Sequence, residues 1–447
     1  MSGSVLSSFA AKTDPPRQVG KQGGGPMAWV GKWVLALSLT ASLGLSTFSR
    51  AGTGEDAPEE VRLAFSPYRQ GPPRVDGLSP GTTLTQSTWQ AAVGVLPPEI
   101  LRLLQAGELA ITVQETTDSP LPEAYVEATL KGVGQVKLGD NGELKNYVAG
   151  LPFPLLDPSD PQAGLKAAWN LRYRNLGESV EARYTVELRD HTGATQRSLE
   201  FQHIFLYGLH RAESDANLAE WEKEGVFFKE YIHALAPLDF AGFQQIRLHY
   251  DRDALADEEW GYDPRTRRVR KTAYNPLTAS AGLNYLTEDR IGFLGYLHPY
   301  EWQFRGRQVV LAPWAIKAEQ AHFGGKGGWY PIDPWELRAA LVLECRPRDA
   351  NHPYGKRVFY LDAQTYAILY VLVYDRQGNH FRTFFLCYGN PAFSPRNTHV
   401  RVPLFAGESW IDHEAQVAAV LTPKQIVYNQ PLGPKLFTVE NLLRQGK

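Results

Sequence analysis

The sequence predicts a mainly β protein of the α+β class, built on a strongly curved antiparallel sheet. From about residue 244 onward, apolar and polar residues alternate in short runs that polar turns separate, which is typical of an antiparallel sheet with one buried face. Helical periodicity is scarce in this part of the chain. The order of the expected elements shows no alternation of strands with helices, so a parallel sheet is not indicated.

The composition is that of a folded protein with a packed core. Of 447 residues, 43% are hydrophobic and 21% are charged, which excludes wholesale disorder. The net charge of −2 shows no excess of basic residues of the kind that binds nucleic acid. Two cysteines are too few for a disulfide framework or a four-thiolate zinc site.

An export signal is expected near the N-terminus. Lys32 supplies a positive charge, a mostly apolar run covers residues 33–48, and small residues mark a cleavage site near Ala51. A single membrane anchor is the alternative, but a bilayer span needs about 20 apolar residues and this run is shorter. The signal begins so cleanly at Met27 that either Met1 or Met27 fits as the start. Cleavage removes five basic residues, one acidic residue and both methionines, so the net charge of the mature chain becomes −6.

The chain is expected to consist of a leader, a lead-in and one large domain. Residues 1–51 hold the upstream segment and the signal peptide, and residues 52–80, rich in Gly, Pro and charge, are expected to be extended. Residues 81–447 are expected to form a single domain, with a mixed α/β part over 81–240 and a β-meander over 241–447.

Two helices are expected in the mixed part. Pro98 suits the first turn of a helix that Gly107 stops, and a second helix is expected over 162–173. Residues 211–224 are acidic and favour a surface helix or lid. The strands expected in this part are 109–116, 125–129, 180–189 and 196–206, the last two as a hairpin.

The C-terminal part is expected to be a meander of strands joined by turns, with little helical periodicity. Asp263-Pro264-Arg265-Thr266 is a favourable turn between two of these strands. The expected strands are 245–251, 259–262, 267–272, 307–312, 336–345, 357–362, 368–375 and 380–388.

Motifs for catalysis, metals and cofactors are not found. The Gly-rich segment 323–329 lacks the Lys-Ser/Thr pair of a phosphate-binding loop, and no Gly-x-Ser-x-Gly elbow is present. His413-Glu414 opens no zinc-binding helix, because Val417 occupies the position of the second histidine. We therefore predict no catalytic residues, no metal site and no cofactor, although an enzyme of unrecognised type stays open.

The two cysteines leave two possibilities open. Cys345 and Cys387 lie in expected strands of one meander. They could form a disulfide in an oxidising compartment if their Cα atoms come within about 7 Å. Equally, each could be a small buried hydrophobic residue.

Aromatic residues crowd the segment 260–304. Rings on strands usually belong to the core. The alternative is an apolar pocket for a lipid or another hydrophobic molecule. The candidate ligand-binding residues are Trp260, Tyr262, Tyr285, Phe293, Tyr300 and Trp302.

A compact basic cluster lies beside these rings. It can be a solvated edge that discourages aggregation of the sheet. Otherwise it is a docking patch for an acidic partner or an anionic head group. The candidate docking residues are Arg265, Arg267, Arg268 and Arg270.

Several motifs in order along the chain resemble one known family. They include Trp260-Gly-Tyr-Asp-Pro-Arg, Tyr300-Glu-Trp, His352-Pro-Tyr-Gly-Lys and Tyr374-Asp-Arg-Gln-Gly, with Gly150-Leu-Pro-Phe-Pro upstream. The family is a group of exported Gram-negative proteins of unknown function, often labelled outer-membrane lipoprotein-sorting-like and related to the LolA/LolB carriers. The resemblance covers nearly all of the mature chain.

The resemblance implies an incomplete antiparallel β-barrel, with helices packed in or over its concave face around an apolar cavity. It also implies work beside envelope exporters of the resistance-nodulation-division type. The segment Ala312-Pro313-Trp314-Ala315 departs from the family's tyrosine-proline-tyrosine-asparagine-like pattern. The family offers no agreed catalytic residues to carry over.

These observations favour a non-enzymatic periplasmic protein that binds a lipid or another hydrophobic molecule, as a carrier or an exporter accessory. A structural or docking protein of the cell envelope, with a solid core and no ligand, is the alternative. Whether the concave face is hollow or filled decides between them.

Overall fold

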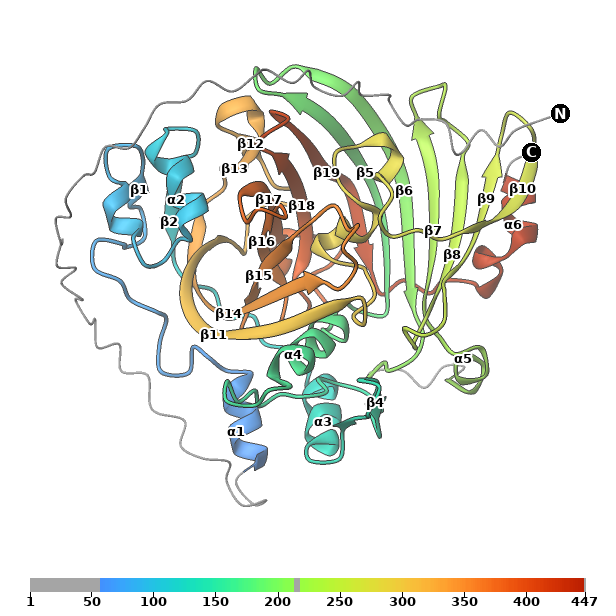
Figure 1. Cartoon of the computed structure of the whole chain (residues 1–447), viewed down its shortest axis with the longest axis horizontal. Helices are drawn as coiled ribbons and strands as arrows, with labels where there is room; N and C mark the ends of the chain where they lie inside the picture. Colours follow the sequence, from blue (N-terminus) through green and yellow to red (C-terminus); the bar gives the residue numbers. More distant parts are fainter. Residues whose placement is uncertain (1–56, 213–217, 446–447) are drawn as a thin grey trace, which may run out of the picture. The chain divides into compact units, whose positions relative to one another are not determined.

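Two antiparallel meanders join in one large sheet in the computed structural model (Figure 1). The structure describes residues 57–212 and 218–445, so the expected signal peptide and its cleavage site lie outside the described residues. The first meander comprises β5 (Ser179–Asp190), β6 (Thr195–Tyr207), β7 (Val226–Ala236), β8 (Gln244–Tyr250), β9 (Glu258–Asp263) and β10 (Arg268–Ala273). The second comprises β14 (Trp335–Pro347), β15 (Lys356–Asp362), β16 (Ile368–Tyr374), β17 (His380–Gly389), β18 (Leu404–Asp412) and β19 (Val417–Tyr428).

The two meanders meet where β19 pairs with β5. This pairing is antiparallel, with Tyr428 opposite Val180 and Val417 opposite Asp190. Strands from the parts of the chain before and after residue 240 therefore share one sheet. The prediction of a mainly β, antiparallel architecture is confirmed.

The remaining strands extend the sheet beyond β14. The long strand β11 (Tyr300–Pro313) pairs antiparallel with one edge of β14, and β2 (Ile111–Gln114) pairs parallel with β14 and antiparallel with β1 (Thr83–Leu84). The described sheet has fifteen strands and is not closed, because its order runs from β1 to β10 without pairing between the ends. Two separate pairs complete the strands: β3 (Lys137–Leu138) with β4 (Leu144–Lys145), and β12 (Phe323–Gly324) with β13 (Tyr330–Pro331).

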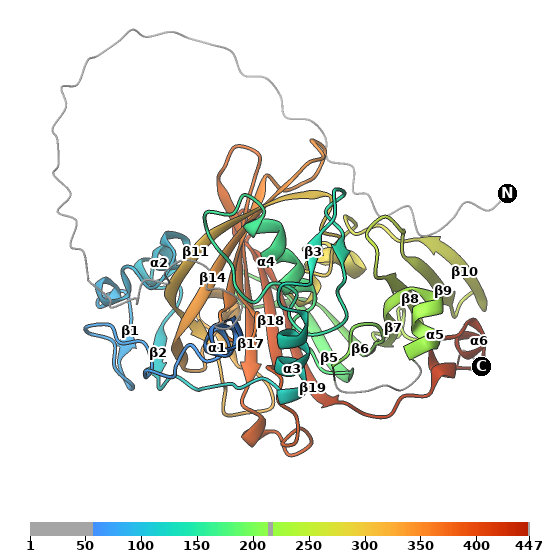
Figure 2. The same ribbon diagram turned by 90° about the horizontal axis from the view of Figure 1, so that it is seen from below.

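The helices are short. They are α1 (Ala57–Ala64), α2 (Pro98–Gln105), α3 (Glu123–Gly132), α4 (Ala163–Arg172), α5 (Leu218–Glu224) and α6 (Val439–Gln445). Figure 2 shows α6 beside β9 and β10 at one end of the sheet. No helix among the described residues is long and apolar enough to cross a membrane. The 3₁₀ turns are Trp89–Ala92, Ser280–Gly282, Thr287–Gly292, Lys326–Gly328, Pro391–Phe393 and Pro434–Phe437.

The helices predicted at 98–107 and 162–173 are confirmed as α2 and α4. Helix α4 packs closely on β11 because Gly164 has no side chain: a Cβ there would lie 2.1 Å from the carbonyl oxygen of Trp302. The approach of backbone to backbone is what glycine permits. Position 164 therefore fixes how α4 sits on the sheet.

Two expectations for the N-terminal part need correction. The strand predicted at 125–129 is wrong, because this segment belongs to α3, where Tyr125, Val126 and Thr129 are buried on one helical face. The extended lead-in is wrong for its described residues, since it contains α1, whose Val61 is completely buried. Of the acidic segment 211–224, the structure places residues 218–224 in α5.

The segment between β10 and β11, residues 274–299, lies across one face of the sheet, and we call it the central loop (Figure 1). Tyr285 of this loop stacks on Trp410 of β18, with ring centroids 3.9 Å apart and planes at 10°. Asn284 donates a hydrogen bond to the carbonyl oxygen of Trp410 at 2.9 Å. Side chains of the central loop therefore fill this part of the face.

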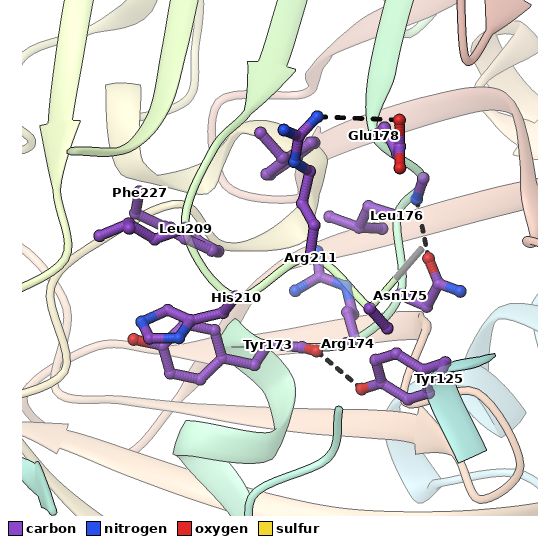
Figure 3. A pocket seen from close by; sticks show the side chains of 13 residues that line it. Tyr125, Tyr173, Arg174, Asn175, Leu176, Glu178, Leu209, His210, Arg211 and Phe227 are labelled. Carbon is purple, nitrogen blue, oxygen red and sulfur yellow. Dashed lines mark hydrogen bonds and ion pairs between the residues drawn. The ribbon is translucent and has the colours of Figure 1, made fainter. Parts of the chain in front are cut away.

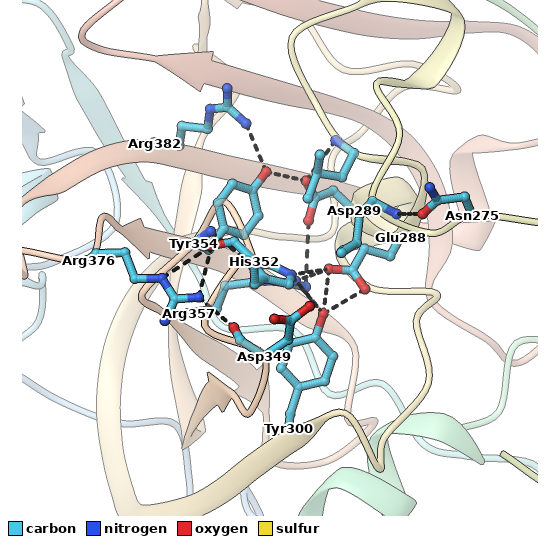
Figure 4. A network of polar contacts seen from close by, with 12 residues as sticks. Asn275, Glu288, Asp289, Tyr300, Asp349, His352, Tyr354, Arg357, Arg376 and Arg382 are labelled. Carbon is cyan, nitrogen blue, oxygen red and sulfur yellow. Dashed lines mark hydrogen bonds and ion pairs between the residues drawn. The ribbon is translucent and has the colours of Figure 1, made fainter. Parts of the chain in front are cut away.

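A buried polar network anchors the central loop to the second meander (Figure 4). The Tyr300 hydroxyl donates to the Glu288 carboxylate at 2.6 Å, and Arg357 of β15 pairs with the same carboxylate. Next to it, the Tyr354 hydroxyl donates to Asp289 at 2.6 Å. Each of these side chains has at least one partner, which offsets part of the cost of burial. Nε and Nη1 of Arg357 and one carboxylate oxygen of Asp289 make no hydrogen bond within the described residues.

The cysteines are free and buried. Cys345 lies on β14 and Cys387 on β17, with β15 and β16 between them in the sheet. The structure therefore contains no disulfide between them. Burial raises the pKa of Cys345 to about 12, so its thiol is not a nucleophile at neutral pH.

Candidate functional site

A small pocket opens where the ends of α4, β6 and β7 meet (Figure 3). Its volume is about 50 Å³. We call it the Arg174 pocket. It is lined by Tyr125, Tyr173, Arg174, Asn175, Leu176, Gly177, Glu178, Tyr207, Leu209, His210, Arg211, Ala212 and Phe227.

A tight connection between α4 and β5 forms one wall. The Asn175 side chain accepts a hydrogen bond from the backbone N–H of Gly177 at 2.9 Å, which is an Asx turn. Gly177 has a φ of +82°, a conformation that side chains disfavour. The chain thus turns within a few residues from the helix into the sheet, and the turn holds Arg174 against the pocket.

Aromatic rings form the deeper walls. The Tyr125 hydroxyl donates to the carbonyl oxygen of Tyr173 at 2.7 Å. Phe227 meets the ring of Tyr173 edge to face at 5.1 Å and that of Tyr207 at 5.8 Å. All four rings are buried. Their mutual packing gives the pocket a rigid, largely apolar wall.

Arg174 is the unusual residue of this pocket. Its side chain is buried, with 6% of the residue exposed. Its Nη1 donates to the carbonyl oxygen of Leu171 at 2.5 Å. Its Nε and Nη2 are also buried, and neither has a hydrogen-bond partner among residues 57–212 and 218–445. Burial lowers the pKa of Arg174, yet an arginine stays protonated in proteins. The pocket therefore contains a buried positive charge whose Nε and Nη2 nitrogens have no partner within the described residues.

Nearby acidic groups do not neutralise this charge. Glu178 lies 3.7 Å from Arg211, so its carboxylate already has a partner. Glu408 is completely buried and accepts a hydrogen bond from the backbone N–H of Gly292 at 2.9 Å. Burial raises the pKa of Glu408 well above its usual range, which favours the uncharged form of its carboxyl group.

His210 forms the remaining polar side of the pocket. Its Nδ1 lies 2.7 Å from the carbonyl oxygen of Val148, and its Nε2 lies 3.1 Å from Asp251. Asp251 also accepts a hydrogen bond from the Tyr173 hydroxyl at 2.6 Å. Burial alone would raise the pKa of Asp251, but the contacts with His210, Arg172 and Tyr173 outweigh it and lower that pKa to about 2. These contacts fix the ring of His210 in place.

The six aromatic residues predicted as a ligand site lie in three separate places. Trp260 and Tyr262 of β9 pack in a cluster with α6 residues, and Tyr285 stacks on β18. Phe293 contacts Tyr300 at 5.8 Å and Trp302 at 5.6 Å, so the structure brings only these three together. None of the six is among the residues that line the Arg174 pocket as the structure describes it. Tyr262, Tyr285, Phe293 and Tyr300 are buried, which favours a packing role.

The four predicted docking residues are exposed and lie together. Arg265 pairs with Asp263 at 3.2 Å, and its guanidinium lies over the ring of Phe243. Arg267 occupies the turn into β10, whose residues Arg268 and Arg270 are exposed. Since β10 is an end strand of the described sheet, this cluster lies on an edge of the sheet.

The Arg174 pocket was not predicted. Its residues come from four separate segments of the chain, and nothing in the local sequence distinguishes Arg174 from the exposed arginines. Within the described residues, no group of three or more His, Cys, Asp and Glu residues could hold a metal ion. The pocket offers groups suited to binding: the guanidinium of Arg174, fixed hydrogen-bond donors and aromatic walls.

The fold and the site thus define a mainly β protein that carries a small polar and aromatic pocket. The chain belongs to the protein family of unknown function DUF1329, whose sequence profile matches residues 83–442. The family resemblance read from the sequence motifs is confirmed.

Similar proteins span parts of this chain. The "Uncharacterized protein PA3922" of Pseudomonas aeruginosa is 26% identical over 280 residues, which are 59% of this chain and 58% of that protein. The chain therefore spans less than two thirds of the length of this relative.

Two solved structures are similar at low identity. A putative outer membrane lipoprotein-sorting protein domain from Vibrio parahaemolyticus is 19% identical, with a TM-score of 0.45, over 64% of this chain and 100% of that chain. The LolA superfamily protein NE2245 from Nitrosomonas europaea is 13% identical, with a TM-score of 0.36, over 61% of this chain and 94% of that chain.

Proposed function

We propose that this is an exported, non-enzymatic protein of the periplasm that binds an amphipathic or hydrophobic molecule, such as a lipid, as a carrier or an accessory to an envelope exporter. The observation that carries the proposal is the rigid aromatic wall of the Arg174 pocket. Pockets that bind small molecules are typically apolar with a few fixed polar groups. The proposed route to the periplasm is the signal peptide cleaved near Ala51.

The size of the pocket limits what it contributes. With a volume of about 50 Å³ it has room for a few water molecules, and thus for one end of an amphipathic molecule. Burying on the order of 100 Å² of apolar ligand surface yields about 2.5 kcal/mol. This is less than a millimolar complex requires, about 4 kcal/mol, so polar contacts must add to the affinity.

Filling the pocket tests the proposal. Ala212 lines the pocket and Ala194 lies exposed in the β5–β6 turn, so Ala212→Trp blocks the site and Ala194→Trp is its matched control. We expect native mass spectrometry and organic extraction to find a co-purifying amphipathic molecule with the unaltered protein and with Ala194→Trp, but not with Ala212→Trp. An empty unaltered protein, or an occupied Ala212→Trp variant, contradicts the proposal.

A second candidate function is docking through the basic edge of the sheet. The observation in its favour is the exposure of Arg268 and Arg270 on the end strand β10, next to Arg267 in the turn. These residues suit an acidic partner or an anionic membrane surface. Charge reversal of all three to Glu should abolish sedimentation with vesicles of anionic lipid. Extraction of an amphipathic molecule should be unaffected by the reversal, so the two functions are separable.

A further inference from the structure

We propose that Arg174 is the counter-ion for the negatively charged head group of the ligand, a carboxylate or a phosphate. This inference rests on the proposed function, because it names the chemical class of the molecule that the pocket receives. It makes the ligand an anionic amphipathic molecule.

The first argument is the cost of the unpartnered cation. Charged side chains are almost never buried unless they are paired, because the loss of hydration is expensive. Arg174 is buried, makes a single hydrogen bond to a carbonyl oxygen, and forms no ion pair with a described carboxylate. A site built this way is incomplete without an anion.

The second argument is the charge balance of the pocket. The carboxylate of Glu178 is engaged by Arg211 at 3.7 Å, and that of Asp251 faces His210 at 3.1 Å. The carboxyl group of Glu408 accepts a hydrogen bond from the backbone of the central loop and makes none with Arg174. Arg174 is therefore left without a carboxylate in hydrogen-bonding contact among the described residues.

The third argument is the direction of the free donors. In a guanidinium group, Nε–H and one N–H of Nη2 lie side by side and point the same way. This fork matches two oxygens of a carboxylate or a phosphate. In Arg174 these are the two nitrogens without partners, while Nη1 is used by the backbone. The donors that hold the side chain in place are thus distinct from those left for a ligand.

Binding of matched probes tests the inference. Decanoate, decyl phosphate and neutral decanol share one alkyl chain, and inorganic phosphate carries the charge alone. Their affinities can be measured by displacement of the neutral fluorophore N-phenyl-1-naphthylamine and by calorimetry. The variants are Arg174→Met, Arg174→Lys and, as the matched control, Arg183→Met, whose side chain is 53% exposed on β5.

We expect the unaltered protein and Arg183→Met to bind decanoate and decyl phosphate at least tenfold more tightly than decanol. Arg174→Met should lose this preference while its affinity for decanol stays the same, and Arg174→Lys should retain part of it. Circular dichroism establishes that the variants are folded. If Arg174→Met does not fold, the weaker preference expected of Arg174→Lys still tests the inference.

Each other outcome has a defined meaning. Equal binding of decanol and decanoate to the unaltered protein, or a preference that survives in Arg174→Met, overturns the inference and leaves the proposed function standing. Inorganic phosphate binding as tightly as decyl phosphate assigns the site to the free anion and overturns the amphipathic ligand. Failure of every probe, decanol included, contradicts both.

Discussion

Arg290 of the central loop and Glu230 of β7 form a buried bidentate ion pair. Their nitrogen and oxygen atoms lie 2.7 Å apart in one contact and 3.2 Å apart in the other. His203 of β6 contacts the same carboxylate at 2.6 Å. Burial alone would raise the pKa of Glu230, but Arg290, His203 and Arg247 outweigh it and hold that pKa well below its usual range. The central loop is therefore attached to both meanders.

Removing the charge of Glu230 should destabilise the fold. Glu230→Gln leaves Arg290 buried without its carboxylate, and breaking a buried pair in this way costs about 3–5 kcal/mol. Urea denaturation measures the change in the free energy of unfolding. The control is Glu301→Gln, which removes a carboxylate 65% exposed in a pair with Arg348 and should cost less than about 1 kcal/mol. Similar losses in both variants would refute the anchoring role.

Replacing Arg174 by methionine should stabilise the protein. The variant removes an unpaired buried charge and keeps an unbranched apolar side chain, so the free energy of unfolding should rise by about 1–4 kcal/mol. Thermal unfolding of Arg174→Met in the absence of ligand measures this, with Arg183→Met as the variant expected to change little. A lower melting temperature for Arg174→Met would show that Arg174 serves the fold.

Stability should fall with acid through His413. Burial lowers the pKa of His413 to about 4, below its unfolded value of about 6.5. The unfolded chain therefore takes up a proton first as the pH falls from about 6.5 to 4, and the folded state loses on the order of 3 kcal/mol. Above pH 6.5 the ring is neutral in both states and has no effect.

The measurement is the free energy of unfolding across this pH window. His413→Asn should reduce the pH dependence, whereas His399→Asn, at an exposed histidine, should leave it unchanged. Part of the dependence should remain in His413→Asn, because burial also lowers the pKa of the neighbouring His380, to about 3. The Nε2 of His413 lies 2.9 Å from the hydroxyl of Thr383. Losing this contact shifts the stability by a similar amount at every pH, so the slope against pH still reports the titration. An unaltered pH profile in His413→Asn would rule out His413 as the titrating group.

Adding one methyl group at position 164 should loosen the contact between α4 and β11. In Gly164→Ala the new Cβ meets the backbone of Trp302, which cannot rotate away, so overpacking should cost about 1–3 kcal/mol. The matched control is Gly433→Ala, where no atom lies within 4 Å of the added Cβ. Thermal melting compares the two variants. Equal melting temperatures would mean that α4 can shift on the sheet without cost.

Much of the sheet could be predicted because its strands carry their own pattern. The hairpin of β5 and β6 and the meander from β14 to β17 alternate or form apolar runs between polar turns, and their positions were predicted. Local pattern is ambiguous where a segment is short. Residues 125–129 include Tyr125, Val126 and Thr129, which favour strands, but the helix buries these three on one face. Only packing distinguishes the two structures for so short a segment.

The candidate site was beyond sequence reasoning for a different reason. The rings between Trp260 and Trp302 were selected because they are dense along the chain, yet the sheet distributes them over three clusters. The Arg174 pocket forms where β6 and β7 bring Tyr207 and Phe227 next to the end of α4. Whether an arginine is buried depends on such contacts between residues far apart in the sequence. The sequence around Arg174 therefore does not predict that it is buried.

The pairing of β19 with β5 has a consequence for folding kinetics. The adjacent contact from the backbone of Glu178 to Asn429 joins residues 251 positions apart, whereas each meander is built from neighbouring hairpins. Closing so long a chain segment costs entropy before any contact repays it, and high contact order slows folding. The two meanders are expected to form as separate units with β5 and β19 as unpaired edges. Until those edges meet, nascent chains are exposed to strand exchange, which makes this pairing the place where a chaperone would be most useful.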